Sequence, residues 1–332
     1  MIDWPADFGN RFLVTVDVEE EFDWSGPFSA TARGMSAIAA MPAMHRRLVS
    51  AGVAPVYLAD HPAATDPASV AVLRHCLDDA GTAIGAQLHP WVNPPQVGPV
   101  DSLASFAGNL PPALEGAKID SLVTAINDSF GRAPLIYRAG RYGLGPATMA
   151  LLAARGFRID SSMRARHDYR RQGGADFDRV GNRAFRLGEG IVEVPLSTVH
   201  TGALRRAGPR LHRLAGLVPR GRGALARSRL LSRVPLTPEG VPATEAIAAI
   251  AAARADGERL LTLSFHSPSL VPGHTPYVRT AADRAAFDRW WDVVLAGLSR
   301  EGYAPVTLDA VIAASERACQ PPVPSASPAP PR

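Results

Sequence analysis

Short apolar stretches alternate with longer stretches of mixed polarity along most of the chain. The first apolar stretch, residues 12–16, reads FLVTV and runs directly into the acid-rich residues 17–23, DVEEEFD. Apolar residues of high β-propensity predict a strand buried on both faces, as in a parallel sheet. Asp17 and Glu19 are two positions apart, so on an extended chain their side chains point to the same side. Such carboxylates repel each other unless a proton or a cation lies between them, although a solvated acidic loop would also fit this stretch.

The same pattern predicts further strands and several helices. The strands are expected at residues 53–59, 83–88, 135–137, 157–159, 191–196, 260–265 and 305–308. The helices are expected at residues 38–49, 67–77, 114–130, 146–155, 244–253 and 281–298, with another after residue 308. Strands and helices that alternate in this way are typical of a parallel β/α barrel or of a doubly wound sheet.

Polar side chains follow several of the predicted strands directly. Asp17, His89, Arg138 and His266 each stand at the carboxyl end of one of them. A barrel gathers all its strand ends into one mouth, whereas an open sheet spreads them along a line. The convergence of these four residues therefore favours the barrel.

This order of strand-end groups resembles the NodB-type polysaccharide deacetylases. The matching motifs are T-V-D-V-E at 15–19, I-G-A-Q-L-H-P-W at 84–91, Y-R-A-G-R-Y-G at 137–143 and L-S-F-H-S-P at 263–268. They span the chain from residue 11 to residue 311 in the order in which the family carries them. The resemblance implies an α/β fold, the irregular (β/α)7 barrel of this family, and hydrolysis of an N-acetyl group on an amino sugar.

The resemblance also assigns catalytic roles. Asp17 matches the general base, His266 matches the general acid that protonates the leaving amine, and Arg138 matches the arginine that orients the aspartate. The fork of an arginine can hold a carboxylate in one geometry, and a histidine titrates near neutrality. Without the resemblance, an ordinary surface arginine would explain Arg138 equally well, and a structural role is the commoner one for a lone histidine such as His266.

The metal motif departs from the family pattern. The family carries His-x-x-x-His, whereas this chain has Gln87 and Trp91 at those positions and His89 between them. Since Glu19 matches the metal-binding carboxylate of the family, the ligands expected for a divalent metal, zinc in the first instance, are Glu19, Gln87 and His89. A glutamine oxygen is a weaker zinc ligand than an imidazole.

Three alternatives remain open for this metal site. His61, at the end of the second predicted strand, could replace Gln87 as a ligand, and Asp17 could contact the metal directly. In the third alternative no catalytic metal binds, and His89 only forms a hydrogen bond to sugar.

Several side chains near the expected mouth of the barrel are candidates for binding the sugar. Aromatic rings can stack on sugar rings, and polar groups can bind hydroxyls. The candidate substrate-binding residues are Trp24, Trp91, Arg141, Tyr142, Asp160 and Tyr277.

Nine arginines and no acidic residue lie between residues 204 and 233. This segment, Arg205–Arg233, is either a solvated helical insertion or a surface for an anionic glycan or for phospholipid headgroups. Nucleic acid is not an expected partner, because the segment has no interleaved aromatic residues and no recognisable motif.

Composition sets the remaining expectations. The chain has 332 residues, of which 46% are hydrophobic and 20% charged, and its two cysteines imply no disulfide framework. One domain is expected over residues 1–318, with the arginine-rich insertion at 204–235 and a disordered Pro-rich tail at 319–332. The first residues resemble no export signal and no apolar run is long enough to cross a membrane, so a cytoplasmic location is expected.

The sequence therefore predicts a hydrolase of carbon–nitrogen bonds other than peptide bonds, acting on a carbohydrate such as a polysaccharide or glycolipid precursor. A deacetylase-like protein that binds carbohydrate without turnover is the main alternative. A metal-dependent amidohydrolase of small ring amides is another. Whether Glu19 and Gln87 face each other beside His89 separates the first two hypotheses.

Overall fold

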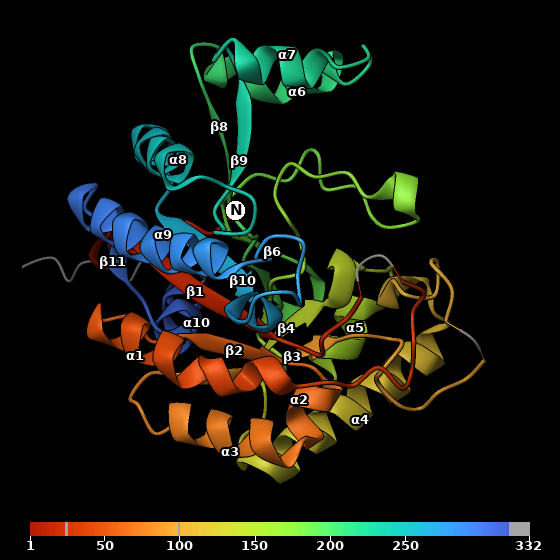
Figure 1. Ribbon diagram of the computed structural model, residues 1–332. Helices are drawn as coiled ribbons and strands as arrows, with labels where there is room; N and C mark the ends of the chain where they lie inside the picture. The colour runs from red at the N-terminus through yellow and green to blue at the C-terminus, as the bar shows by residue number, and fades with distance from the viewer. Residues whose placement is uncertain (24–25, 99, 319–332) are drawn as a thin grey trace, which may run out of the picture.

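The structure is a computed structural model, and it describes residues 1–23, 26–98 and 100–318 (Figure 1). The Pro-rich tail and the candidate sugar ligand Trp24 lie outside the described residues. Among the described helices, none is both long enough and apolar enough to cross a membrane.

Parallel strands form one curled sheet at the centre of the molecule. In spatial order they are β10 (Leu260–His266), β1 (Arg11–Val18), β2 (Val56–Ala59), β3 (Ala83–Leu88), β4 (Ile136–Ala139), β5 (Ile159–Asp160) and β7 (Val192–Glu193). The short strand β6 (Phe185–Arg186) pairs antiparallel with β7, and β11 (Ala304–Pro305) pairs with the start of β1. The predicted α/β fold with a parallel, barrel-like sheet is confirmed.

Hydrogen bonds outside the strand ladders join the two ends of the curled sheet. Ser197, just beyond β7, donates its backbone N–H to the carbonyl of Thr262 in β10 at 3.1 Å. The Thr262 N–H in turn donates to the Ser197 hydroxyl at 2.9 Å. These bonds bring β7 beside β10, so the carboxyl ends of the strands surround one mouth.

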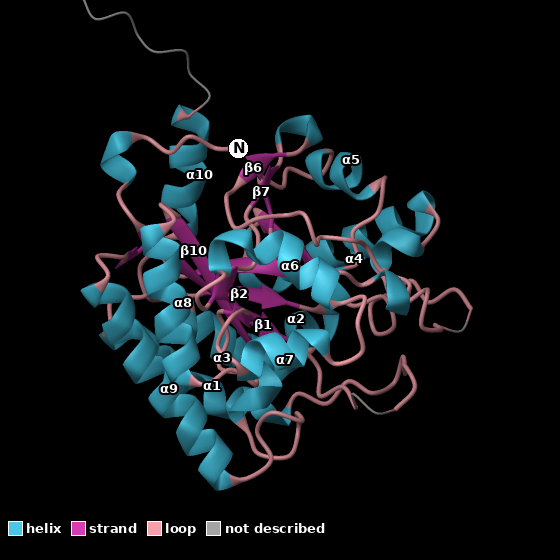
Figure 2. Ribbon diagram, turned by 90° about the horizontal axis from the view of Figure 1, so that it is seen from above, coloured by secondary structure: helices cyan, strands magenta, loops and turns pink. Residues whose placement is uncertain are grey.

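Helices cover the outside of this sheet (Figures 1 and 2). They are α1 (Met41–Ser50), α2 (His61–Thr65), α3 (Pro67–Cys76), α4 (Pro112–Phe130), α5 (Thr148–Ala153), α8 (Ala243–Ala255), α9 (Ala281–Arg300) and α10 (Leu308–Arg317). The sequence signals at helix starts explain two of them. Asp66 caps α3 ahead of Pro67, and Thr280 forms a capping box with Asp283 at the start of α9.

Successive side chains of β1 point alternately into the interior of the curled sheet and outward, toward the helices that cover it. Leu13 packs with residues of β2, β4, β5, β7 and β10, so it lies inside the curl, whereas Val14 and Val16 belong to the core beneath the helices. Asp17 shares the parity of Leu13, two pleats further toward the mouth. On its inner side, β1 therefore carries the apolar Leu13 at its start and the carboxylate of Asp17 near the mouth.

An antiparallel pair of strands carries the arginine-rich segment away from the barrel. Strands β8 (Thr198–Thr201) and β9 (Ser232–Pro235) hold the helices α6 (Gly208–Ala215) and α7 (Gly221–Arg227) between them. We call residues 202–231 the arm; it stands clear of the sheet at the top of Figure 1. The sequence pattern predicted neither β8 nor β9 as a strand.

Candidate active site

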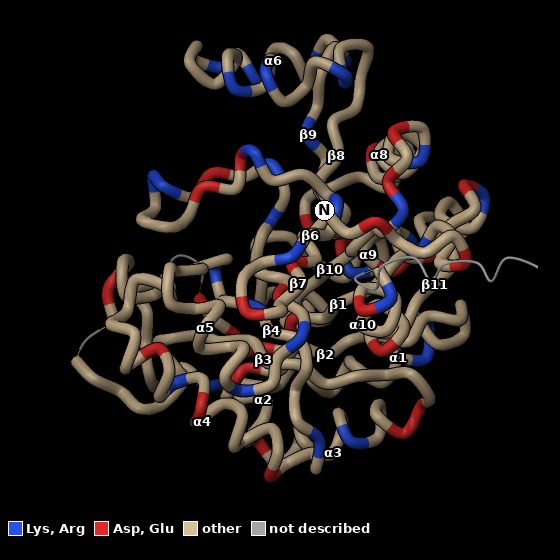
Figure 3. The backbone as a smooth tube through the Cα atoms, turned by 180° about the vertical axis from the view of Figure 1, so that it is seen from behind, with Lys and Arg blue, Asp and Glu red and all other residues tan. Residues whose placement is uncertain are grey.

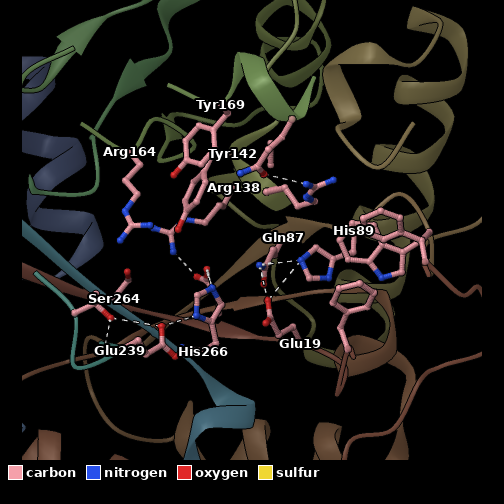
Figure 4. A pocket seen from close by; sticks show the side chains of 18 of the residues that line it. Glu19, Gln87, His89, Arg138, Tyr142, Arg164, Tyr169, Glu239, Ser264 and His266 are labelled. Atoms are coloured by element: carbon pink, nitrogen blue, oxygen red, sulfur yellow. Dashed lines mark hydrogen bonds and ion pairs between the residues drawn. The ribbon is translucent and has the colours of Figure 1, made fainter. Parts of the chain in front are cut away.

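A cavity of about 460 Å³ opens at the carboxyl ends of the strands (Figure 4). Register explains why the strand-end residues meet there. Asp17 pairs with His266 across β1 and β10, and Gln87 pairs with Arg138 across β3 and β4. All four line the cavity. The structure thus brings the predicted catalytic residues to one place.

Arg138 holds Asp17 at the floor of the cavity. Its Nη1 donates to Asp17 Oδ1, its Nη2 donates to Thr15 Oγ1 at 3.0 Å, and its Nε donates to the carbonyl of Ser161 at 2.9 Å. Arg138 and Asp17 are both buried. Because the guanidinium is fixed by other partners, it orients the carboxylate.

Glu239 holds His266 on the other side of Asp17. His266 Nδ1 donates to Glu239 Oε2 at 2.6 Å, and His266 Nε2 lies 3.5 Å from Asp17 Oδ2. Burial alone would lower the pKa of His266, but the carboxylates of Glu239, Glu19 and Asp17 together raise it to about 10. Burial opposes ionisation of Glu239, yet the charge of His266 lowers the pKa of Glu239 below its ordinary value. The pair is thus an ion pair with the imidazolium Nε2–H directed toward Asp17.

Glu19, Gln87 and His89 form a second group on the cavity wall. Gln87 Nε2 donates to Glu19 Oε2 at 2.9 Å and lies 3.2 Å from His89 Nε2, while Glu19 Oε2 and His89 Nε2 are 3.5 Å apart. Burial raises the pKa of Glu19 to about 7. Glu19 therefore needs a proton or a cation beside it near neutral pH.

A buried carboxylate pair stands behind His89 and fixes its orientation. His89 Nδ1 donates to Glu20 Oε2 at 2.9 Å, and Trp91 Nε1 donates to Glu20 Oε1. Asp60 accepts the Glu20 backbone N–H at 3.0 Å, and burial together with Glu20 raises the pKa of Asp60 well above its usual range. Since Glu20 takes the Nδ1 proton, the lone pair of His89 Nε2 faces the cavity.

Glu19 Oε2, Gln87 Nε2 and His89 Nε2 lie at separations that would suit the ligands of one divalent cation. Ligands about 2.0–2.2 Å from a tetrahedral zinc ion lie about 3.3–3.6 Å from one another, close to the separations seen here. Gln87 Oε1 is buried without a hydrogen-bond partner. Turning the amide over exchanges this oxygen with Nε2 and presents it beside Glu19 and His89.

Other candidate ligands fit less well. Asp17, Glu19 and His266 also lie within metal-binding distance of one another. However, an imidazolium held by Glu239 has no lone pair to offer a metal. His61, considered above as a substitute, forms a hydrogen bond with Arg33 at 2.7 Å and does not line the cavity.

The expected sugar-binding residues separate into two groups. Trp91, Arg141, Tyr142 and Tyr277 line the cavity. Asp160 does not, which corrects the expectation for this residue. Its carboxyl group is fully buried, accepts from the Ser162 hydroxyl, and its pKa is raised by burial. Asp160 is therefore not part of the cavity wall.

The sequence pattern missed several residues of the cavity wall. Glu239 lies in the loop after β9, Arg164 and Tyr169 lie in the irregular segment after β5, and Phe28 comes from the loop after β1. None of them stands at the end of a predicted strand, and only the tertiary fold brings them to the mouth. Arg164, Tyr142 and Tyr169 lie together on the wall away from His89 (Figure 4).

Comparison with known proteins bears on the fold. No protein-family model matches the chain, and no curated protein sequence matches it. A solved structure from Mycobacterium smegmatis, provisionally assigned as a polysaccharide deacetylase, matches with a TM-score of 0.55 at 14% identity, over 95% of this chain and 93% of that one. This chain has the polysaccharide deacetylase fold.

Two other solved structures also match most of this chain. A family 4 carbohydrate esterase from Streptomyces lividans, in complex with acetate, covers 91% of this chain and 94% of its own, at 11% identity and a TM-score of 0.41. A 4-alpha-glucanotransferase from Thermococcus litoralis matches 92% of this chain but only 40% of its own, at 11% identity and a TM-score of 0.51. Because the latter has a different chemistry, the reaction must be argued from the site.

Proposed function

We propose that this protein is a metal-assisted hydrolase that removes the acetyl group from an N-acetylated amino sugar. The observation that carries the proposal is the contact of Glu19 with Gln87 beside His89, which closes a three-ligand set. The same cavity holds a fixed carboxylate, Asp17, and a charged histidine, His266. A base, an acid and a cation site around one cavity are what amide hydrolysis requires.

The cation would be held by Glu19, Gln87 and His89. When bound, it supplies positive charge that favours ionisation of a water and stabilises a developing oxyanion. Burial raises the pKa of Glu19 to about 7 and so opposes its ionisation. The positive charge of the cation would counter this effect of burial and keep Glu19 ionised. Zinc suits this mixed nitrogen and oxygen set, although a glutamine weakens it.

Asp17 and His266 would move the protons. Asp17, held in place by Arg138, takes a proton from the water that attacks the acetyl carbon. When the carbon–nitrogen bond breaks, its electron pair goes to nitrogen, which takes the proton of His266 Nε2. Acetate and a free amine leave, and proton exchange with solvent restores both residues. With a pKa of about 10, His266 carries this proton at neutral pH.

The aromatic wall favours a carbohydrate substrate. Trp91 stacks on His89 with ring centroids 4.3 Å apart, and Phe28 lies 5.0 Å from Trp91. Tyr142 and Tyr169 stack at 5.1 Å. Rings of this kind offer flat apolar faces to the C–H groups of a sugar while their edges remain polar.

One observation also supports carbohydrate binding without turnover. A glutamine takes the place of an imidazole, and its amide already donates to Glu19. If that hydrogen bond persists in the presence of metal, the cavity retains its sugar-binding wall but lacks the cation that hydrolysis requires. The protein would then be a carbohydrate-binding relative of the deacetylases.

The test is an assay that measures both products of the reaction. Purified wild type and Asp17→Asn are incubated with N-acetylated oligosaccharides and zinc, cobalt or manganese, and acetate and free amine are measured together. The proposal predicts equal amounts of both products from wild type, and a rate at least 100-fold lower in Asp17→Asn, the scale of general base catalysis. Sugar binding without acetate release under any of the metals would establish the binding protein instead.

A further inference from the structure

Two arginines of the cavity have no carboxylate partner among the described residues. Arg138 is paired with Asp17, whereas Arg141 and Arg164 line the same cavity without an ion pair. Arg141 donates to the Ser102 carbonyl at 3.3 Å and to Gln172 Oε1 at 3.1 Å, both neutral groups. Arg164 lies 5.7 Å from the ring centroid of Tyr142. Both guanidinium charges are therefore uncompensated.

The backbone holds Arg141 in an unfavourable conformation. Arg141 and Tyr142 have φ angles of 55° and 61°, the left-handed region that residues with a side chain seldom adopt in succession. The Arg141 guanidinium also stacks on Phe106, 4.1 Å from the ring centroid. Strain of this kind persists where surrounding contacts impose it, and it is enriched at ligand sites.

The cavity also holds three carboxylates. Asp17 pairs with Arg138 and Glu239 pairs with His266, which leaves Glu19 beside His89. Two arginines, Arg141 and Arg164, against this one carboxylate leave the cavity positive, and a bound metal would increase this. A positive, partly enclosed cavity attracts anions, and the planar fork of arginine matches carboxylate and phosphate groups.

We propose that the sugar bound in this cavity carries an acidic group, a carboxylate or a phosphate, which Arg164 and Arg141 recognise. This inference builds on the proposed function, which supplies the sugar, but binding of the anion requires no hydrolysis. It narrows the substrate from amino sugars in general to acidic or phosphorylated ones.

The experiment compares four probes by calorimetry on the Asp17→Asn protein, in which turnover is suppressed. The probes are N-acetylglucosamine and its derivatives with a carboxylate at C6, a phosphate at C6 or a phosphate at C1. We expect at least one anionic probe to bind tenfold or more tightly than the neutral sugar. Arg164→Gln and Arg141→Gln should each abolish most of that preference, whereas Arg132→Gln, an exposed arginine elsewhere, should retain it.

The three anionic probes separate the possible sources of the charge. A preference for the C6 carboxylate indicates an acidic sugar, and a preference for either phosphate indicates a phosphorylated precursor. The proposal is overturned if no anionic probe binds more tightly than the neutral sugar, or if the preference survives in both arginine variants. Anion binding without acetate release from wild type would contradict the proposed function alone.

The arm supports a second, independent inference, because it concentrates exposed apolar side chains. Leu217 is 80% exposed, and Leu214 and Val218 are each 60% exposed. Leu204 and Leu230 are exposed as well, so five of the ten exposed large hydrophobic residues of the described chain lie in this segment. Leu214 lies in the last turn of α6, and Leu217 and Val218 follow directly after the helix, where the Leu217 N–H donates to the Leu214 carbonyl at 3.0 Å. The three exposed side chains therefore lie at the same end of α6.

Arginines surround these side chains. Six arginines of the arm are exposed and have no carboxylate partner among the described residues: Arg206, Arg210, Arg220, Arg222, Arg227 and Arg229. Arg205 pairs with Asp256 and Arg213 with Asp178, and these two pairs attach the arm to the rest of the molecule. No acidic residue lies on the arm, which shows blue and no red in Figure 3.

We infer that the arm docks on the surface of an anionic lipid bilayer. Arginines bind lipid phosphates, while leucines beside them enter the boundary between headgroups and acyl chains. A nucleic acid would satisfy the arginines but not the exposed leucines, and the arm offers no exposed aromatic ring for base stacking. Strand β9, which follows the arm, ends two residues before Thr237 of the cavity wall, so docking would bring the cavity close to the lipid surface.

The test is sedimentation of the full chain with lipid vesicles. We expect binding to phosphatidylcholine vesicles that contain phosphatidylglycerol, at least tenfold weaker binding to pure phosphatidylcholine, and weakening by salt. Two triple variants should lose binding. One combines Leu214→Ser, Leu217→Ser and Val218→Ser, and the other combines Arg220→Gln, Arg222→Gln and Arg227→Gln. The matched controls Val293→Ser on α9 and Arg279→Gln with Arg300→Gln, all exposed elsewhere, should retain it.

Two results would overturn the inference about the arm. One is wild-type protein that does not sediment with anionic vesicles, or does so equally with neutral ones. The other is retention of vesicle binding by both arm variants. If duplex DNA or an acidic polysaccharide binds and vesicles do not, the partner is a polyanion rather than a bilayer. All substituted positions are exposed, so circular dichroism should find every variant folded.

Discussion

Glu239 decides the charge of His266, although the two residues lie 27 positions apart and on different elements. The same is true throughout the cavity, since Asp17 depends on Arg138, and His89 depends on Glu20. Sequence reasoning named Asp17, His89, Arg138 and His266 because they stand at strand ends, and it named Glu19 and Gln87 from the resemblance to the deacetylase motifs. It did not locate Glu239 or Glu20 as supporting groups, because hydrogen bonds to such groups depend on loop conformation rather than on periodicity.

Replacing Glu239 tests this dependence. In Glu239→Gln, only Glu19 and Asp17 still oppose the effect of burial, so we expect the pKa of His266 to fall from about 10 toward its ordinary value of 6.5. The basic limb of the activity profile should move to lower pH accordingly. Proton NMR of the His266 ring measures the pKa, with the exposed Glu245→Gln as the control. An unchanged pKa would mean that Glu239 does not hold the charge.

The same pair makes stability depend on pH in a defined direction. Because the folded-state pKa of His266 is raised, its contribution is complete below pH 6.5 and is lost as the pH rises through about 10. The difference in unfolding free energy between wild type and Glu239→Gln should therefore be largest below pH 6.5 and should shrink toward pH 10. Urea denaturation across this range measures it. A difference that grows with pH would contradict the assignment.

Gln87 gives a second prediction at this scale. An imidazole binds zinc more firmly than an amide oxygen, so Gln87→His should raise zinc affinity tenfold or more, the size of a typical ligand effect. Competition with a fluorescent chelator measures the change. Gln172→His provides the matched control, because Gln172 lines the same cavity but accepts from Arg141 and adds a histidine outside the ligand set. Equal gains in both variants would argue against a ligand position at Gln87.

At the scale of elements, periodicity predicted most strands and helices of the barrel. The helix over residues 114–130 is observed as α4 and the strand over 260–265 as β10, and both bury apolar residues at regular spacing. The pair β8 and β9 was missed because it lies apart from the main sheet and its two strands, TVHT and SRVP, are short and partly polar. Where packing against the barrel does not select the side chains, periodicity carries little information.

Gly85 shows how tightly these elements pack. A Cβ atom at this position in β3 would lie 2.5 Å from Ile136 Cγ2 and 2.8 Å from the Ile136 carbonyl oxygen. Gly85→Ala should therefore force the strands apart and lower the unfolding free energy by about 1–3 kcal/mol, the usual cost of overpacking. Thermal or urea denaturation measures it. Gly181→Ala, where a Cβ meets open space, should cause no comparable loss, and equal effects at both sites would contradict this packing.

At the scale of the whole molecule, the parallel barrel explains why distant residues share one site. All parallel strands end at the same mouth, so a polar residue at each carboxyl end reaches the cavity whatever its position in the chain. This rule allowed the fold and the floor of the site to be predicted. The upper wall, with Arg164 and Tyr169, comes from irregular segments whose course no local pattern specifies.

Metal content is the measurement that tests the central claim most directly. Mass spectrometry of purified wild type, after incubation with zinc, cobalt or manganese, should find close to one divalent ion per chain. His89→Ala should lose that ion, while His61→Ala, which changes a histidine outside the cavity, should retain it. Wild type that binds none of these metals, or His89→Ala that binds them as firmly as wild type, would contradict the account of Glu19, Gln87 and His89 as a metal site.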